Sequence, residues 1–351
     1  MNRFLFWQLL AALALLGCSP RISEFKLAFG SCGHQDHPLT IFEEVVRHKP
    51  DVFLFLGDNI YGDTYVMDTL RAKYGRLGAK PGYQRLKAQA KILATWDDHD
   101  YGFNDGGRHY PFKAESKEIF LDFFEEAADS ERRRHEGIYH TYWFDLEGLR
   151  IQLILLDNRT FRDDLPLNTA GVKPDRRYFY PLDYLPHTSP DSALLGEAQW
   201  AWLESELRKP ADIRLIGTGT QFGVEYNGYE AWANFPHEQR RMAELIRATR
   251  AEGVAFLSGD VHYAEISRRD DFEGLYPIYD LTASGLSMDW HFATPNRYRV
   301  EGPVMDNHFG LLTVRKRGKA VGLLAEVWDF RGNQRIEYVI PLDALRFGSG
   351  K

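Results

Sequence analysis

Six short hydrophobic runs in this sequence are each followed at once by side chains that can ligate a metal ion or carry a proton. The runs span residues 25–29, 52–56, 90–95, 151–156, 213–216 and 254–257. The residues that follow them are Gly30-Ser31-Cys32-Gly33-His34, Gly57-Asp58-Asn59-Ile60-Tyr61, Trp96-Asp97-Asp98-His99-Asp100, Asp157-Asn158-Arg159, Gly217-Thr218-Gly219-Thr220-Gln221 and Ser258-Gly259-Asp260-Val261-His262. Thiol, carboxylate, imidazole and amide groups are those from which metal sites and acid–base sites are built.

The hydrophobic runs have the length and composition of buried strands. In open α/β sheets, ligands bind outside the carboxyl ends of the strands. If the six strands are parallel neighbours, the six polar clusters therefore meet at one rim. Acids packed together repel one another and burial raises their pKa, so a bound cation relieves both penalties. The pattern thus predicts a metal site.

Each cluster also has a plainer interpretation. Asp58, after a strand and a glycine, is compatible with a turn acid, and His262 with a hydrogen-bonded core histidine. The run from Asp97 to Asp100 is compatible with a solvated acidic turn. The combination favours the metal site, because three acids around one histidine follow Trp96 and an apolar strand directly, which is an uncommon grouping.

Helical patterns alternate with these strands, which is typical of an α/β fold. We expect helices over residues 39–48, 115–127, 196–209 and 236–252. In the C-terminal quarter, residues 311–316, 320–328 and 334–340 are strand-like and joined by short turns, which predicts antiparallel hairpins. We expect one sheet of βαβ units and a second sheet fed by these hairpins to pack face to face, with helices outside.

Residues 157–195 contain several prolines and no clear periodic pattern. We interpret them as an extended insertion over the site and not as a second domain. Together with residues 286–309, this segment is expected to shape selectivity, and Tyr184 and Trp290 are of interest there.

The first eighteen residues resemble a targeting segment. Arg3 gives a positive start, and residues 4–16 are apolar apart from Gln8. This run suits a secretory signal and is short of the about 20 residues that a bilayer span needs. Leu15-Leu16-Gly17-Cys18 resembles the bacterial lipoprotein cleavage box, in which the cut precedes a lipid-bearing cysteine. The alternative is a plain signal peptide with a chance cysteine.

The sequence therefore predicts a lipoprotein signal peptide over residues 1–17, a lipidated tether over 18–24 and one domain over 25–345. Cys18 would anchor the protein to a membrane, in the periplasm or at the cell surface. Ser19 resembles the signal for outer-membrane retention in Gram-negative bacteria. Cys32, the other of the two cysteines, then has no disulfide partner, which metal ligation or burial would explain.

Composition narrows the classes further. The 351 residues are 44% hydrophobic and 26% charged, an ordinary globular composition. The net charge of −7 is spread along the chain without a basic stripe, so no nucleic-acid-binding surface is predicted. Nothing in the sequence indicates an oligomeric state.

Three motifs in order resemble the alkaline phosphatase D family of calcineurin-like metallophosphoesterases. They are Gly57-Asp58-x-x-Tyr61, Trp96-Asp97-Asp98-His99-Asp100 and Ser258-Gly259-Asp260-Val261-His262. Gly30-Ser31-Cys32, Asp157-Asn158-Arg159 and Thr218-Gly219-Thr220-Gln221-Phe222 fit the same pattern, and the resemblance covers residues 25–340. It implies a four-layer αββα sandwich that hydrolyses phosphomonoesters, phosphodiesters or both.

The resemblance also implies a dinuclear or larger metal centre, with Fe³⁺ and Ca²⁺, other divalent metals being possible. Carried over residue by residue, Cys32 and Tyr61 would ligate the iron and Asp58 would bridge the two ions. Asp260 and His262 stand in the place of further ligands. Asp98 and Asn104 are alternatives for the second metal, and the sequence leaves both open.

Roles in catalysis follow from the same resemblance. The metals would neutralise the phosphoryl oxygens and acidify a water that attacks in line. His99 would protonate the leaving alkoxide or hold the phosphate, with Asp97 and Asp100 as its orienting neighbours. Arg159 would bind phosphate through its guanidinium fork. The remaining candidates are Gln221, for the substrate, the metal or its water, Arg162, for phosphate or a surface ion pair, and His34, His37, Trp232 and His237 as cleft residues.

A protein of another class also fits the motifs. It is a surface lipoprotein that binds a phosphorylated ligand on an inactive phosphoesterase scaffold. The completeness of the predicted ligand set favours the enzyme, because a degenerate scaffold would usually have lost a ligand. Hydrolysis of another kind of ester on the same metals is a third interpretation.

Overall fold

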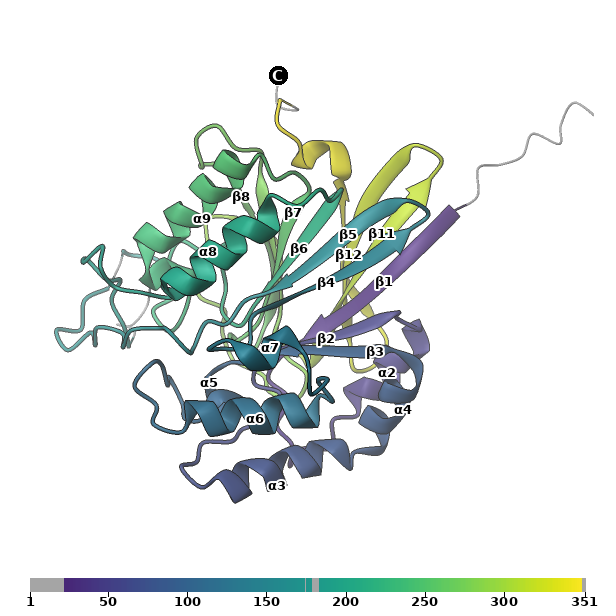
Figure 1. Cartoon of the computed structure of the whole chain (residues 1–351). Helices are drawn as coiled ribbons and strands as arrows, with labels where there is room; N and C mark the ends of the chain where they lie inside the picture. Colours follow the sequence, from purple (N-terminus) through teal and green to yellow (C-terminus); the bar gives the residue numbers. More distant parts are fainter. Residues whose placement is uncertain (1–21, 174, 179–182, 349–351) are drawn as a thin grey trace, which may run out of the picture.

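The computed structural model describes residues 22–173, 175–178 and 183–348, and its strands form two sheets (Figure 1). The strands of the first sheet are β1 (Ile22–Gly30), β2 (Val52–Leu56), β3 (Lys91–Thr95), β11 (His308–Arg317), β12 (Ala320–Asp329) and β13 (Gln334–Pro341). Their order across the sheet is β13-β12-β11-β1-β2-β3. The strands β1, β2 and β3 are parallel, whereas β11 is antiparallel to β1.

The second sheet has seven strands within the described residues. They are β4 (His140–Leu146), β5 (Leu149–Leu155), β6 (Ile213–Thr218), β7 (Val254–Ser258), β8 (Ala264–Arg269), β9 (Ile278–Ala283) and β10 (Arg299–Val304). Their order is β10-β8-β9-β7-β6-β5-β4. Four neighbours, β5, β6, β7 and β9, run parallel, so their carboxyl ends lie at one edge.

Helices cover the outer faces of both sheets (Figure 1). Those of the first half are α2 (Ile41–His48), α3 (Met67–Gly78), α4 (Pro81–Gln89), α5 (Asp98–Tyr101), α6 (Lys113–Phe123) and α7 (Glu131–Arg134). The later ones are α8 (Gly196–Leu207), η1 (Trp232–Asn234), α9 (Pro236–Thr249) and η2 (Leu342–Leu345). Most of the first group lies against the first sheet, and α8 and α9 lie against the second (Figure 1).

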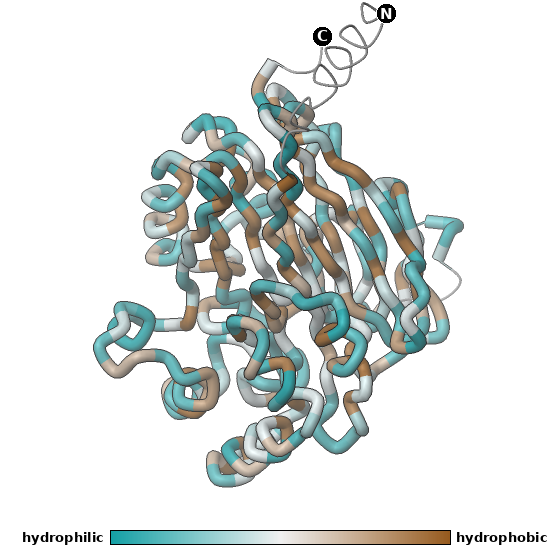
Figure 2. Tube along the Cα trace, turned by 90° about the vertical axis from the view of Figure 1, so that its right-hand side faces the viewer, coloured by the Kyte–Doolittle hydropathy of each residue, from teal (hydrophilic) through white to brown (hydrophobic). Residues whose placement is uncertain are grey.

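The alternation of side chains along β2 explains how the layers are held together. Val52, Leu54 and Leu56 join a core that also contains strand residues of the second sheet. Phe53 and Phe55 point the other way and pack with residues of α2, α3 and α6. A strand that is apolar on both faces is buried on both, which is the environment of a central layer. Figure 2 shows hydrophobic residues concentrated along the strands and hydrophilic ones toward the periphery.

The predicted four-layer αββα sandwich is confirmed, with one correction to its strands. The C-terminal hairpins form as predicted, but they extend the first sheet instead of feeding a second one, because β11 pairs with β1. Leu27 lies opposite Leu312 and Phe25 opposite Val314 in that pair, and all four side chains belong to the core between the sheets. The six predicted strands are therefore divided between the sheets, three in each.

Some boundaries also differ from the prediction. β1 begins at Ile22, so the last part of the predicted tether, residues 22–24, belongs to the sheet. The predicted signal peptide and the lipidated Cys18 lie outside the described residues. α9 ends at Thr249, three residues early, because Arg250 adopts the left-handed conformation.

The segment 157–195 carries one isolated bridge, between Leu167 and Tyr184, and no helix or strand among its described residues. It runs on to α8 and contributes residues to the cavity described below. No helix within the described part of the chain is long and apolar enough to cross a membrane.

Candidate metal centre

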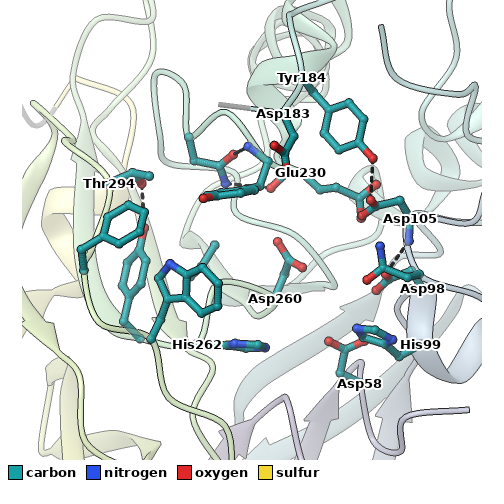
Figure 3. Close-up of a pocket in the computed structure, with 17 residues that line it drawn as sticks. Asp58, Asp98, His99, Asp105, Asp183, Tyr184, Glu230, Asp260, His262 and Thr294 are labelled. Atoms are coloured by element: carbon teal, nitrogen blue, oxygen red, sulfur yellow. Dashed lines mark hydrogen bonds between the residues drawn. The ribbon is translucent and has the colours of Figure 1, made fainter. Parts of the chain in front are cut away.

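A cavity of about 260 Å³ lies where the carboxyl ends of the two sets of parallel strands meet. Figure 3 shows Asp58, His99 and His262 at one side of it, Asp260 near the centre, and Asp105, Asp183, Tyr184 and Glu230 at the other side. The lining residues are Asp58, Asp98, His99, Asn104, Asp105, Asp183, Tyr184, Asn227, Tyr229, Glu230, Asp260, Val261, His262, Tyr263, Trp290, Phe292 and Thr294.

The first set of predicted ligands converges beside this cavity from both sheets. The Sγ atom of Cys32 lies 3.4 Å from Oδ2 of Asp58, and Cys32, Asp58 and His262 offer ligand atoms within 4.8 Å of one another. The hydroxyl of Tyr61 lies 3.0 Å from Nε2 of His262. Thiol, carboxylate, phenol and imidazole groups thus share one small volume.

A second set overlaps the first. Asp97, Asp98 and Asp260 form one group of ligand atoms within 4.8 Å, and Asp58, Asp98 and His99 form another. Asp58 therefore belongs to a group with the Cys32 thiol and to a group with the Asp98 carboxylate. A carboxylate with two oxygens in this position can serve two ions, which is the bridging role that the resemblance implies for Asp58.

An unusual backbone conformation directs several of these side chains toward the site. Cys32, Asp58, Asp260 and His262 all have positive φ, at 60°, 49°, 78° and 57°. This left-handed region is unfavourable for residues with a Cβ and persists mainly at functional sites, at a cost of about 1–3 kcal/mol each. Each residue stands just after a strand, where the left-handed turn bends the chain sharply at the rim.

Gly57 allows the close approach of the first two loops. Its φ is +98°, and a Cβ placed there would lie 2.4 Å from the Cβ of Asp97. No side chain fits in that space. The glycine thereby lets Asp58 and Asp98, on neighbouring strand ends, share the site.

The electrostatics of the group fit a bound cation. Burial raises the pKa of Asp58 and Asp260 well above the ordinary value, and neighbouring carboxylates raise each of them further. One buried oxygen on each of Asp58, Asp97 and Asp98 has no hydrogen-bond partner. Unsatisfied buried carboxylate oxygens are costly unless a metal coordinates them. Burial also raises the pKa of the Cys32 thiol to about 12, and a metal ion would hold it as the thiolate.

Asp98 and Asn104 both line the cavity, so the geometry is compatible with either as a ligand of the second metal. Oδ2 of Asp98 accepts a hydrogen bond of 2.7 Å from the backbone N–H of Asp105. Burial raises the pKa of Asp98, but the charges of Arg159 and His99 outweigh it and hold that pKa below its ordinary value. Asp98 is therefore anionic over the physiological range.

His99 is oriented by a residue that the sequence analysis did not identify. Its Nδ1 lies 2.8 and 2.9 Å from the two carboxylate oxygens of Asp63, so Nε2 is the ring nitrogen left for a substrate. Burial lowers the pKa of His99, but the charge of Asp98 and the hydrogen bond that Nδ1 donates to Asp63 raise it to about 9. The predicted orienting neighbours, Asp97 and Asp100, have other partners.

Asp100 fixes the backbone of two loops. It accepts hydrogen bonds from the backbone N–H groups of Asp97 at 2.7 Å, Asp58 at 3.2 Å and Asn59 at 3.3 Å. These bonds tie the loop after β2 to the start of α5. Asp100 thus sets the separation of Asp58 and Asp98 from behind the site.

The structure gives Arg159 a different role from the predicted binding of phosphate. Its side chain is fully buried and does not line the cavity. The guanidinium pairs with Asp97 at 2.5 Å and Glu230 at 2.5 Å and lies 3.6 Å from Asp98. Because these carboxylates occupy it, the structure offers no direct phosphate contact at Arg159. Arg162 pairs with Glu230 at 2.8 Å in the same buried network, and not at the surface.

Gln221 is also withdrawn from the cavity. Its amide donates to Thr282 at 3.1 Å and Glu265 at 3.3 Å, and its oxygen accepts from the hydroxyl of Tyr263 at 3.4 Å. The predicted contact of Gln221 with substrate, metal or water is therefore not seen. Gln221 instead supports Tyr263, which does line the cavity.

The four predicted cleft residues do not line the cavity either. His34 and His37 stack on each other, and His34 stacks on Tyr61, which places them behind a predicted ligand. Trp232 is a core residue whose indole N–H donates to Thr218, and His237 bonds the backbone of residue 192.

Among the site residues that were not predicted are Asp63, Asp105, Asp183, Tyr229 and Glu230. They lie in loops, where no strand or helix period marks them. The Gly62-Asp63 and Gly228-Tyr229-Glu230 sequences, each a glycine followed by functional side chains, are the local signal that was present.

A two-sheet sandwich with overlapping thiol, carboxylate, phenol and imidazole groups at its strand ends defines the metallophosphoesterase class. The chain belongs to the PhoD-like phosphatases, because the model of that family matches residues 27–297. The predicted family is thus confirmed. The protein is a phosphoric ester hydrolase with a metal centre and a phosphate-ester substrate.

Solved structures support the fold. A structure described as that of PhoD aligns with a TM-score of 0.67 at 17% identity, covering 91% of this chain and 72% of the other. GAP50, the anchor in the inner membrane complex of Plasmodium, aligns at 0.57 with 12% identity and covers 93% and 89%. The yellow lupin purple acid phosphatase PPD1 aligns at 0.54 with 12% identity and covers 91% and 54%. Among curated proteins, none matches this chain.

Proposed function

We propose that this protein is an exported, lipid-anchored hydrolase of phosphomonoesters, phosphodiesters or both, with Fe³⁺ and Ca²⁺ as its metals. The observation that carries the proposal is the pair of overlapping ligand groups that share Asp58, whose Oδ1 has no hydrogen-bond partner. Cys32, Asp58, Tyr61 and His262 would hold the iron. Asp58, Asp260 and either Asp98 or Asn104 would hold the calcium.

These assignments follow the chemistry of the donors. Imidazole is a common iron ligand, and carboxylate and amide oxygens suit calcium. When bound, two such ions would neutralise charge on a phosphoryl group and lower the pKa of a water molecule that attacks it. The chain's own residues bind those ions, orient the ester and supply a proton.

His99 is the proposed proton donor. Asp63 holds its Nδ1, so the proton on Nε2 faces the cavity that His99 lines. With a pKa raised to about 9, the imidazole is protonated at neutral pH and can pass that proton to the leaving alkoxide oxygen. Solvent then restores the proton on Nε2. No covalent bond between the enzyme and phosphorus is required.

The lipid anchor bears on where the substrate comes from. Ile22 begins β1, whereas Cys32 follows its other end, and a strand of nine residues spans about 26 Å. The four residues from Cys18 to Ile22 reach at most about 14 Å. The described chain therefore begins at the end of β1 away from the cavity, and we infer that the substrate arrives from the aqueous phase. The proposed location is the periplasm or the cell surface, on the outer membrane if the organism is Gram-negative.

Hydrolysis of an aryl phosphomonoester and a bis-aryl phosphodiester tests the activity of the full-length protein in detergent. We expect turnover of at least one, with Asp58→Asn lowering kcat/KM by more than about 100-fold, since outer-shell changes alone cost about 10–100-fold. Asp68→Asn, on the exposed start of α3, is the matched control and should keep full activity. Normal turnover by Asp58→Asn would disprove the bridging role.

The location is tested separately. Cys18→Ala should abolish labelling by a fatty-acid probe and leave the signal segment uncleaved, which mass spectrometry of the intact protein would show as a longer chain without the lipid. An unlabelled wild-type protein that is already soluble would contradict the anchor and leave the hydrolase assignment standing.

A further inference from the structure

Three aromatic side chains form a wall of the cavity that the metal assignment does not use. Tyr229, Trp290 and Phe292 all line it. The ring of Trp290 lies 6.4 Å from that of Tyr229 at 84°, 6.0 Å from the His262 ring at 70° and 6.1 Å from Phe292 at 50°. Trp290 is thus inclined steeply to the other rings that line the cavity, as one side of a box is. The ring that lies parallel to it, that of His291 at 8°, does not line the cavity.

The charge of the cavity is of one sign. Six of its lining residues are acids, and none of the described lining residues is Lys or Arg. Asp58, Asp98 and Asp260 belong to the proposed metal centre. Glu230 forms ion pairs with Arg159 and Arg162. Asp105 accepts a hydrogen bond from the hydroxyl of Tyr184 and offers a ligand atom within 4.8 Å of those of Asp98 and Glu230. Asp183 forms no ion pair with a basic side chain of the described residues, so its charge is left to face the cavity.

Asp183 lies next to the aromatic wall. The backbone N–H of Tyr184 donates to the carbonyl of Gly228 at 3.0 Å, which brings residues 183–184 alongside Tyr229. Figure 3 places Asp183 with Glu230, across the cavity from Asp58 and His99. Asp183 therefore flanks the space on the side away from Asp58 and His99, whereas Trp290 reaches from the wall to the ring of His262 at the metal centre.

We propose that this wall, made of Tyr229, Trp290 and Phe292 with Asp183, binds a cationic alkylammonium group on the alcohol part of the phosphate ester. The inference rests on the proposed function, because it takes the phosphoryl group to lie at the metal centre. Ring faces attract a cation, most strongly the face of Trp, and a quaternary ammonium is the usual guest of a box of steeply inclined rings. A nearby carboxylate selects a positive charge over a neutral alkyl group of the same shape.

The proposal implies hydrolysis of the bond between phosphorus and the alcohol oxygen. The bond from phosphorus to the alcohol oxygen breaks, and one from phosphorus to the oxygen of water forms. The departing oxygen takes the proton of His99 Nε2, and the attacking water releases its proton to solvent. The products are an ammonium alcohol and a phosphate.

Two isosteric substrates measure the contribution of the ammonium charge to recognition. Choline phosphate and 3,3-dimethylbutyl phosphate have the same shape and differ in one positive charge. With the full-length, metal-loaded protein we expect kcat/KM to be about tenfold or more higher for choline phosphate, as a partly desolvated cation–π contact provides. Trp290→Leu should bring the ratio close to one, and Asp183→Asn should lower it several-fold.

Matched controls are available on the same chain. Trp143→Leu removes a half-exposed tryptophan from β4, and Asp191→Asn neutralises an exposed acid outside the cavity. Both should keep the wild-type ratio. Equal kcat/KM for the two isosteres in the wild-type protein, or a ratio that survives in both Trp290→Leu and Asp183→Asn, would overturn the proposal.

Binding of the product alcohols separates this proposal from the hydrolase assignment. Calorimetry with choline and 3,3-dimethyl-1-butanol needs no turnover. If neither ester is hydrolysed but choline binds tighter and Trp290→Leu removes the difference, the ammonium site stands and the proposed activity fails. If aryl esters are hydrolysed but the two alcohols bind alike, the activity stands and the ammonium site fails.

A last experiment distinguishes a soluble ester from a lipid head group as the source of the substrate. Turnover of choline phosphate or glycerophosphocholine in solution would identify a soluble source. Turnover confined to phosphatidylcholine vesicles would identify a lipid source. Either result retains the ammonium site, and the first is the one that the position of Ile22 favours.

Discussion

The hydroxyl of Tyr61 lies 3.0 Å from Nε2 of His262, although 201 residues separate them in the chain. Tyr61 follows β2 of the first sheet and His262 follows β7 of the second. Their meeting shows that the carboxyl ends of both sets of parallel strands open on the same space. A ligand set drawn from two sheets is rigid, because each half is held by its own strands and by the core between them.

Cys32→Ser should lower iron content and activity together. The Cys32 thiol is fully buried beside Asp58 and Ser284, and a serine hydroxyl is a poorer anionic ligand than a thiolate. Elemental analysis and turnover of an aryl phosphate would be measured on the same sample. A Cys32→Ser protein with full iron and full activity would show that the thiol is only a buried core residue.

His99→Ala should lower kcat by about 10²–10⁴-fold, as loss of a general acid does, while both metals remain bound. Asp63→Asn should lower kcat less, because the ring is then badly oriented but still present. An ester with a very acidic phenol as leaving group needs little protonation and should be affected least by either change. Loss of metal from His99→Ala would instead make His99 a ligand.

Arg159→Met should destabilise the fold by about 3–5 kcal/mol, because it leaves Asp97 and Glu230 buried without their partner. Arg85→Met removes an exposed ion pair and should cost less than about 1 kcal/mol. Denaturant unfolding measures both. If Arg159 bound phosphate directly, the variant would keep its stability and phosphate would become a much weaker inhibitor.

His308 should make stability depend on pH. It is fully buried and accepts a hydrogen bond from the backbone N–H of Ser284 through Nε2, while Nδ1 donates to the carbonyl of Asp306. Protonation of Nε2 would remove the acceptor, and burial lowers the pKa of His308 to about 4.

The unfolded histidine, with a pKa near 6.5, takes up its proton first as the pH falls. This part of the stability is therefore complete above about pH 6.5 and is lost down to pH 4, at most about 3 kcal/mol. A His308→Gln variant, measured by denaturant unfolding from pH 7 to pH 4, should lose less stability over that range than the wild type. Equal losses in the two proteins would contradict the assignment.

Regular elements were the most predictable part of this protein. Val52–Leu56 was predicted with both boundaries correct, because a strand buried on both faces is a continuous apolar run between polar residues. α3 was missed, since its buried residues Leu70, Tyr74 and Leu77 make only a narrow stripe on a polar helix. The partner of the C-terminal hairpins was mistaken because pairing between distant strands leaves no local signal.

Some residues of the candidate site could be predicted from the sequence and others could not. Side chains directly after strands, such as Asp58 and Asp260, were identified because sheet topology fixes where a strand ends. The role of Arg159 was misjudged, since the sequence does not show that Glu230, 71 positions later, returns to neutralise it. Trp290 drew attention in the sequence, but its contact with Tyr229 emerges only when two loops distant in the chain are placed around one cavity.

The most direct test of the account is elemental analysis of the full-length protein, purified in detergent without added metal, paired with turnover before and after chelation. We predict roughly one iron and at least one calcium per chain, loss of activity on chelation, and recovery when both metals are returned. A folded protein that takes up no metal and hydrolyses neither aryl ester would contradict the metal-dependent hydrolase and point to a ligand-binding scaffold.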